Sequence, residues 1–343
     1  MIPRSNVVRG TAAGSILLLL AVVAFLLELA LGRGGMPVNH VLPALVGDPV
    51  RSFETLILDL RLSRAVGAAF AGGGMAIAGA LLQSATRNPL AEPGILGISG
   101  GAVLGVVLAL WAGVRLPGGA PTTALIGAAL APVLIAAVLG RRWNSPRDLA
   151  LTGVLVGLLL SAAASGVLVT SGQTLGVVLR WTIGSLNAVN WSDLTLMWPA
   201  TVVGLVLIAI IIRPLGALAL GDHVAVSIGA RPTAVRAVAL VAAVLLTCGA
   251  VTVGGALPFL GLAAPHIARR LVGSAPAILL PVSALMGTAI LLCADLLAIS
   301  ISVDLRGIGT VTGLPVGAVI APLAGPYLLV LLRNKTRLKG GIR

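Results

Sequence analysis

Long apolar runs follow one another from end to end of this chain, and they constrain its fold more than any other feature. A helix needs about 20 mostly apolar residues to cross the hydrocarbon core of a bilayer. A shorter apolar piece, 255–267, contains Pro258 and Pro265 and is typical of a broken helix packed inside a bundle. The nine longer runs are 14–31, 65–85, 94–112, 122–140, 149–171, 192–212, 233–253, 276–298 and 313–332. Together they predict an all-α integral membrane protein with about ten transmembrane helices.

The composition leaves no room for a large water-soluble domain. Charged residues make up 10% of the chain, against about 25% in an average soluble protein. We therefore expect residues 1–343 to form a single transmembrane domain embedded in the lipid bilayer. The first run, 14–31, follows Arg4 and Arg9 as in a signal peptide, but the residues after it, GRGG (32–35), make a poor small-x-small cleavage site. It is interpreted as a retained first span.

The distribution of basic residues predicts the orientation. With ten spans and a cytoplasmic N-terminus, 16 of the 23 Lys and Arg residues fall in cytoplasmic segments. The inverted arrangement would place those 16 outside, against the positive-inside rule. A nine-span chain would export the basic tail RNKTRLKGGIR. We therefore expect both termini in the cytoplasm of a multi-pass protein of the inner (plasma) membrane.

Several function classes are excluded by what the sequence lacks. The net charge of +13 does not indicate nucleic-acid binding, because the basic residues separate apolar runs and aromatic residues are only 3%. No GxxxxGK[ST] phosphate loop occurs, and His40, His223 and His266 are too scattered for a metal set. The sequence therefore predicts no catalytic site, cofactor or metal, and a protein that is not itself an enzyme.

An ion-coupled secondary transporter would place acidic groups at mid-membrane. Asp295, late in the run 276–298, is the only real candidate, and an interfacial or packing role is favoured for it over a pathway role. Glu28 is expected near the outer end of its span, where it can reach the interface. Glycines four residues apart, such as Gly97, Gly101 and Gly105, predict close helix contacts whatever the bundle does.

Three polar loops interrupt the runs, at 32–64, 213–236 and 299–312. The middle one, RPLGALALGDHVAVSIGARPTAVR, is too polar to span a membrane. It is predicted to form two short helices broken at Gly221, with Asp222 as an N-cap.

Six motifs give the chain a family resemblance. They are RLSR (61–64), AGALLQ (78–83), RNPLAEPGILGISGGA (87–102), LALG (218–221), GGALPFLGLAAPHIARRLVG (254–273) and LPVGAVIAPLAGPYLLVLL (314–332). In this order the motifs resemble the permease family of ABC importers for iron-siderophores, haem and cobalamin. The resemblance covers nearly the whole chain, and RNPLAEPG together with PFLGLAAPHIARR is its most specific part.

The resemblance implies a type II ABC importer permease bundle. Two permease subunits, identical or different, would surround a central path, and two ABC ATPase subunits would bind the cytoplasmic face and hydrolyse ATP. Loop 213–236 would then hold the coupling helices that dock into the ATPase. The residues that match the family there are Leu218, Ala219, Leu220, Gly221, Ala225 and Gly229.

On the outside, the resemblance implies arginines that meet acidic residues of an external substrate-binding protein. Arg61 and Arg64 match this position, although Ser63 replaces the family's usual proline, and Arg306 is a third candidate. Exposed charges of this kind steer docking more than they add affinity. A structural or gating role is expected for the motif residues Gln83, Asn88, Pro89, Pro265 and His266. Within this set, the side chains of Gln83 and Asn88 are expected to satisfy freed backbone groups.

The function expected from these features is the permease subunit of an ATP-driven importer of ferric siderophores. Haem or cobalamin import is the alternative within the family. An ion-coupled secondary transporter is a weaker alternative, because the sequence shows a docking loop and few mid-membrane acids. The sequence does not identify the chelate, because the binding protein provides most of the specificity.

Overall fold

A computed structural model describes residues 4–31, 55–140, 146–171, 180–187, 189–219, 221–301, 313–323 and 325–326. Throughout these ranges the regular structure is helical, without a strand. The α-helices are α1 (Arg4–Leu31), α4 (Ser63–Thr86), α5 (Ile98–Trp111), α6 (Gly119–Leu139), α7 (Pro146–Ser171), α9 (Trp191–Ala219), α10 (Asp222–Ser227), α11 (Pro232–Gly254), α12 (Leu260–Val272) and α13 (Pro276–Ser300). Short π- or 3-10-helical turns are η2 (Thr55–Leu62), η3 (Pro93–Leu96) and η5 (Arg180–Gly184), and residues 316–323 are also helical.

The expected all-α membrane fold is confirmed. Among the described residues, 7 helices are long and apolar enough to cross a membrane. They are α1, α4 with its preceding turn, α6, α7, α9, α11 and α13. The predicted span 94–112 is shorter than expected, because Gly97 has a positive φ of 68° and the helix α5 begins only at Ile98.

The predicted broken piece 255–267 is shifted in the structure. Its first residues form a turn, and α12 then runs from Leu260 to Val272 with Pro265 inside it. Phe259, just before the helix, has a left-handed φ of 62°, which ends the preceding turn and allows the helix to start. A helix of 13 residues is about 20 Å long, too short for a straight span.

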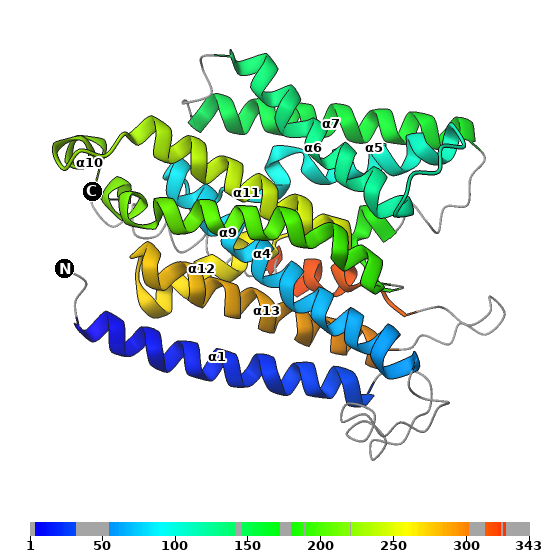
Figure 1. The fold of residues 1–343 in the computed structure, drawn as a ribbon, viewed down its shortest axis with the longest axis horizontal. Coiled ribbons are helices and arrows are strands. Elements are labelled where there is room, and N and C mark those ends of the chain that lie inside the picture. Colours follow the sequence, from blue (N-terminus) through cyan, green and yellow to red (C-terminus); the bar gives the residue numbers. More distant parts are fainter. Residues whose placement is uncertain are drawn as a thin grey trace.

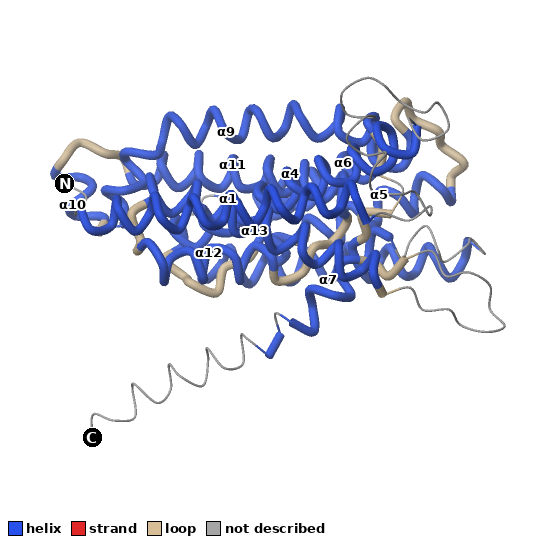
Figure 2. The backbone as a smooth tube through the Cα atoms, turned by 90° about the horizontal axis from the view of Figure 1, so that it is seen from below, coloured by secondary structure: helices blue, strands red, loops and turns tan. Residues whose placement is uncertain are grey.

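Helix α4 lies at the centre of the bundle, with α13 and α11 packed most extensively against it (Figure 1). Helices α5, α6 and α7 pack together as a group on one side, and α1 lies on the opposite side against α13 (Figure 1). The start of α1 and the short helix α10 lie at the same end of the bundle (Figure 2). The long helices therefore separate two ends, each with its own polar residues.

Glycines set how closely the helices approach one another. A methyl group added at Gly79 of α4 would lie 1.6 Å from the carbonyl oxygen of Gly261 in α12. A methyl group at Gly72 would lie 2.6 Å from the Gly287 carbonyl oxygen, and one at Gly101 would lie 2.2 Å from that of Gly127. Backbones meet directly at these crossings. Gly101 belongs to the predicted four-residue series, whereas Gly72 and Gly79 lie outside it.

Pro265 explains one of these contacts. A proline within a helix lacks the N–H that would bond to the carbonyl four residues earlier. In α12 that carbonyl belongs to Gly261, whose oxygen faces Gly79 of α4. The freed carbonyl is thus enclosed between two helices, in a place that only glycine leaves open.

Replacing Gly79 with alanine should destabilise the bundle by about 3 kcal/mol, the upper end of the cost of overpacking. The added methyl group would meet backbone atoms, which cannot rotate away. Thermal unfolding of the purified protein in detergent measures the loss. Gly166→Ala in α7 is the matched control, because nothing lies within 4 Å of a methyl group there. Equal melting temperatures for the two variants would contradict this account of the packing.

Candidate functional site

Helix α10 lies in the middle of the predicted coupling loop, but its surroundings differ from the prediction. The loop 213–236 does not begin with a separate short helix, because α9 continues through Pro214 to Ala219. The break at Gly221 is confirmed, and its φ of 124° requires glycine. Gly229 also has a positive φ, of 83°, and ends the turn after α10.

The other predicted coupling residues fall into two groups. Leu218 and Ala225 are buried at 1% and 0% exposure and anchor α10 to the bundle. Ala219 is the last residue of α9, and Leu220 lies outside the described residues. The exposed apolar side chains of this loop are instead Val224, Val226 and Ile228. The ATPase-coupling role of the predicted set stays a prediction.

Asp222 is not the N-cap of α10, contrary to the prediction. Gly221 occupies the cap position, without a side-chain hydrogen bond. The Asp222 carboxylate instead accepts hydrogen bonds from two arginines. Arg87 Nη2 donates to Oδ1 at 2.5 Å, and Arg236 Nη2 donates to Oδ1 and Oδ2 at 2.8 and 3.0 Å. Sequence reasoning missed this cluster, although the predicted orientation had placed all three residues on the same side of the membrane.

The segment Arg87–Gly94 turns the chain after α4. Arg87 has a left-handed φ of 51°, and the side-chain Oδ1 of Asn88 accepts the backbone N–H of Leu90 at 3.0 Å. Asn88 therefore satisfies a freed backbone group, as predicted. The same expectation is wrong for Gln83, because neither polar atom of its buried amide has a hydrogen-bond partner in the described part of the chain.

The far end of this segment contacts the start of α12. Glu92 Oε1 accepts the backbone N–H of Phe259 at 2.6 Å. Burial raises the pKa of the Glu92 carboxyl above its usual value, and the hydrogen bond from Phe259 partly offsets this rise. A cavity of about 400 Å³ lies beside this contact, lined by Glu92 and Phe259 together with Gly157 and Ser161 of α7.

The roles predicted for Pro89, Pro265 and His266 stay predictions. Pro89 is half-buried in the turn between α4 and η3, and Pro265 is buried within α12. The structure brings neither of them, nor the half-buried His266, into the lining of this cavity.

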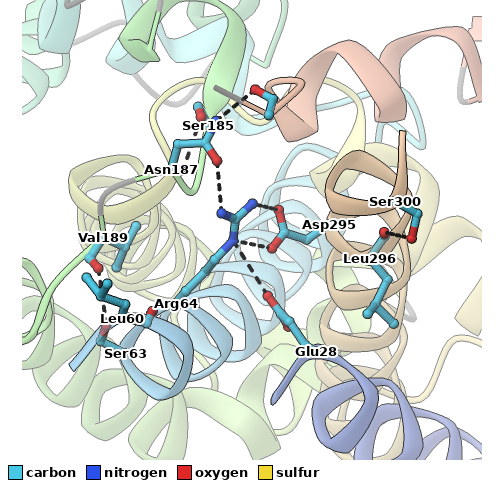
Figure 3. A network of polar contacts seen from close by, with 11 residues as sticks. Glu28, Leu60, Ser63, Arg64, Ser185, Asn187, Val189, Asp295, Leu296 and Ser300 are labelled. Atoms are coloured by element: carbon cyan, nitrogen blue, oxygen red, sulfur yellow. Dashed lines mark hydrogen bonds and ion pairs between the residues drawn. The ribbon is translucent and has the colours of Figure 1, made fainter. Parts of the chain in front are cut away.

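At the opposite end of α4, Arg64 is the centre of a buried ion cluster (Figure 3). Its guanidinium donates from Nε and Nη2 to the two oxygens of Asp295 in α13, at 2.6 and 2.7 Å. Nη1 donates to Asn187 Oδ1 at 2.8 Å, and Asn187 in turn donates to the Gly313 carbonyl at 2.9 Å. Such two-point pairing fixes the orientation of both side chains.

Glu28 of α1 also faces this cluster and is buried within the protein. Its carboxylate is 1% exposed and lies 3.9 Å from Arg64 Nε, beyond hydrogen-bonding distance. Asp295 is fully buried and bound by Arg64 on both oxygens, and its packing role stays a prediction. Two carboxylates thus share a single guanidinium, which binds one of them directly.

Arg61 lies one turn before Arg64 and has a different partner. Its Nη1 donates to the carbonyls of Leu29 and Ala30, at 2.7 and 3.3 Å, at the last turn of α1. A cation at this position satisfies free helix carbonyls and complements the helix dipole. The expectation that Arg61 and Arg64 are exposed charges is therefore corrected, since both engage groups of this chain. Their docking role stays a prediction, and Arg306 lies outside the described residues.

Ser63, the residue that departs from the family pattern, joins these elements. Its hydroxyl is fully buried and lies 3.1 Å from the carbonyl oxygen of Val189, just before α9. It also lies within hydrogen-bonding distance of the Asp59 and Leu60 carbonyls in η2. A proline would lack this hydroxyl, so the serine adds a contact between the start of α4 and the segment that leads into α9.

Comparison with known proteins decides the family. The model of the FecCD transport family matches residues 19–334. The chain belongs to the FecCD transport family. This family comprises permease subunits of ABC transporters, which are not themselves enzymes, and the FecCD chain described here is a multi-pass membrane permease.

Relatives of this FecCD chain match along nearly its whole length. It is 35% identical to the Fe(3+)-citrate import system permease protein YfmE of Bacillus subtilis, over 94% of this chain and 95% of that protein. It is 33% identical to the ferric enterobactin transport system permease protein FepD of Escherichia coli, over 94% and 95%. A solved metal-chelate type ABC transporter in an inward-facing conformation superimposes with a TM-score of 0.77 at 26% identity, covering 94% of this chain and 99% of that one.

The ion cluster predicts different costs for its two carboxylates. Asp295→Ala removes the direct partner of Arg64 and should destabilise the protein by about 3–5 kcal/mol, the cost of breaking a buried ion pair. Glu28→Gln removes a carboxylate that does not bind the guanidinium directly, and should cost less than about 1 kcal/mol. Thermal unfolding in detergent compares the two variants. A larger loss in Glu28→Gln than in Asp295→Ala would contradict the assignment of Asp295 as the main partner.

Proposed function

We propose that this chain is the permease subunit of an ATP-driven ABC importer for ferric siderophores. In this proposal it forms half of the translocation path in the inner (plasma) membrane, and ATP is hydrolysed on partner ATPase chains. The observation that carries the proposal is the family match over residues 19–334, which includes the loop around α10. The chain itself performs no covalent chemistry and moves its cargo by changing conformation.

Helix α10 supports the docking of an ATPase. It protrudes at one end of the bundle in Figure 1. Val226 in α10 and Ile228 just after it are 60% and 65% exposed. Apolar side chains at the tip of a rigid, polar-flanked element are suited to enter a groove on a soluble partner. Leu218 and Ala225, buried beneath them, hold the element on α9.

The face of α7 supports a second permease subunit, identical or different. Leu151, Leu155, Leu158 and Leu159 are each more than half exposed on this helix. The cavity beside Glu92 opens along the same helix, at Gly153, Gly157 and Ser161. A second subunit placed against α7 would enclose a path between the two chains.

The cargo is proposed from the relatives. YfmE is named for ferric citrate, FepD for ferric enterobactin and FhuG of Bacillus subtilis for ferric hydroxamate. Cobalamin is the alternative, because the BtuC permease of Halobacterium salinarum is 33% identical over 88% of this chain. Haem is a further alternative within the resemblance.

The external substrate-binding protein would dock at the end of the bundle opposite α10. Arg306 is proposed there as a docking residue, together with Arg61 and Arg64 if binding of that protein rearranges their present contacts. The orientation proposed has both termini in the cytoplasm. It is supported by the position of the start of α1 at the same end as α10 (Figure 2).

The rival function, an ion-coupled secondary transporter, is less well supported. It would use free acidic groups along the path, whereas Asp295 is bound on both oxygens by Arg64. A secondary transporter would also need no helix such as α10 for docking an ATPase.

The test is uptake of radioiron-labelled ferric citrate, ferric enterobactin and a ferric hydroxamate by proteoliposomes that contain the permease, its ATPase and its binding protein. We expect uptake of at least one of these chelates, dependent on ATP and abolished by vanadate. Labelled cobalamin and haem are the competing cargoes. Uptake that persists without ATP and follows a proton or sodium gradient would overturn the proposal.

A further inference from the structure

Asp222 is a junction between four helices. Its carboxylate, at the start of α10, binds Arg87 just after α4 and Arg236 in α11. Arg87 Nη2 also donates to the Leu218 carbonyl in α9 at 3.0 Å, and Arg236 Nε donates to the Ala85 carbonyl in α4 at 3.2 Å. Each arginine therefore bonds to Asp222 and to a helix carbonyl at the same time.

Because this cluster is partly exposed, it contributes little to the folding free energy of the protein. Arg87 and Asp222 are 45% and 42% exposed, and Arg236 is 15% exposed. Exposed ion pairs contribute on the order of 0–1 kcal/mol to folding. Two arginines on one carboxylate nevertheless define the position of α10 relative to α4 and α11, because the hydrogen bonds approach from different helices.

The same arginine begins the turn that ends at the cavity. Only four residues separate Arg87 from Glu92, and the Asn88 side chain folds the chain between them into a hydrogen-bonded turn. Glu92 then holds the backbone of Phe259, and both residues line the cavity. A displacement of α10 at Asp222 thus has a short covalent and hydrogen-bonded route to the cavity wall.

We propose that the Arg87–Asp222–Arg236 cluster and the turn Arg87–Glu92 transmit movement of α10 to the wall of the cavity at Glu92 and Phe259. Asp222 and Arg87 are positioning residues: they act on the path through α10 and through the turn. The inference rests on the proposed function, because it assumes that a partner ATPase moves α10. The inference names the residues through which movement of α10 would change the shape of the cavity on the translocation path.

The experiment compares Asp222→Asn, Arg87→Gln and wild type as complete importers in proteoliposomes. Two quantities are measured together: ATP hydrolysis and uptake of whichever of the labelled ferric chelates the wild-type importer takes up. We expect ATPase co-purification at the wild-type yield, hydrolysis within about twofold, and a roughly tenfold fall in chelate imported per ATP in both variants. Asp222→Glu, which keeps the carboxylate, should restore most of the ratio.

Two further variants serve as controls. Arg213→Gln removes an exposed arginine near the same end of α9 and should leave the ratio unchanged. Glu92→Gln keeps an oxygen that accepts the Phe259 N–H, whereas Glu92→Leu removes it; only the leucine variant should lower the ratio.

A wild-type ratio in the Asp222→Asn importer would overturn the inference. It would also be overturned if loss of bound ATPase accounted for the entire loss of uptake, since the cluster would then affect docking alone. Failure of the proposed function gives a different result, because the wild-type importer itself would then show no ATP-driven uptake of any ferric chelate.

Discussion

Direct backbone contact around α4 is the constraint on which the rest of the structure depends. Apolar side chains alone do not drive helices together in lipid, where the surroundings are equally apolar. Close approach at Gly72 and Gly79 supplies the contact instead, and it places α12 and α13 against α4 along its length. The ion pair of Arg64 and Asp295 forms between α4 and α13, two helices that are held this close at Gly72.

Helix α4 connects the two polar clusters as a single rigid element. It has 24 residues and is about 36 Å long, close to the thickness of a bilayer core. Arg64 fixes its first turn to α13 through Asp295, and Arg87 follows its last residue and contacts α10 through Asp222. The buried pair at one end is expected to resist movement, whereas the more exposed cluster at the other end can rearrange at low cost.

Much of the fold could be predicted from the sequence, but its polar contacts could not. The apolar runs predicted the long helices correctly, because the thickness of the bilayer sets the length of a spanning helix. The sequence predicted that α9 ends at residue 212, because Arg213 and Pro214 are typical of the end of a spanning helix. In the structure the helix continues to Ala219. Partners far apart in the chain, such as Arg64 and Asp295, carry no local pattern, so sequence reasoning assigned the arginine to an external protein and left the aspartate without a partner.

A distance measurement across the proposed connection tests the central claim most directly. Spin labels at exposed Val226 of α10 and exposed Leu158 on α7 would report their separation in the full importer, after replacement of Cys248 and Cys293. The account predicts that trapping ATP shifts this distance in the wild type and that the shift is lost in Asp222→Asn with the ATPase still bound. An equal shift in both proteins would contradict it.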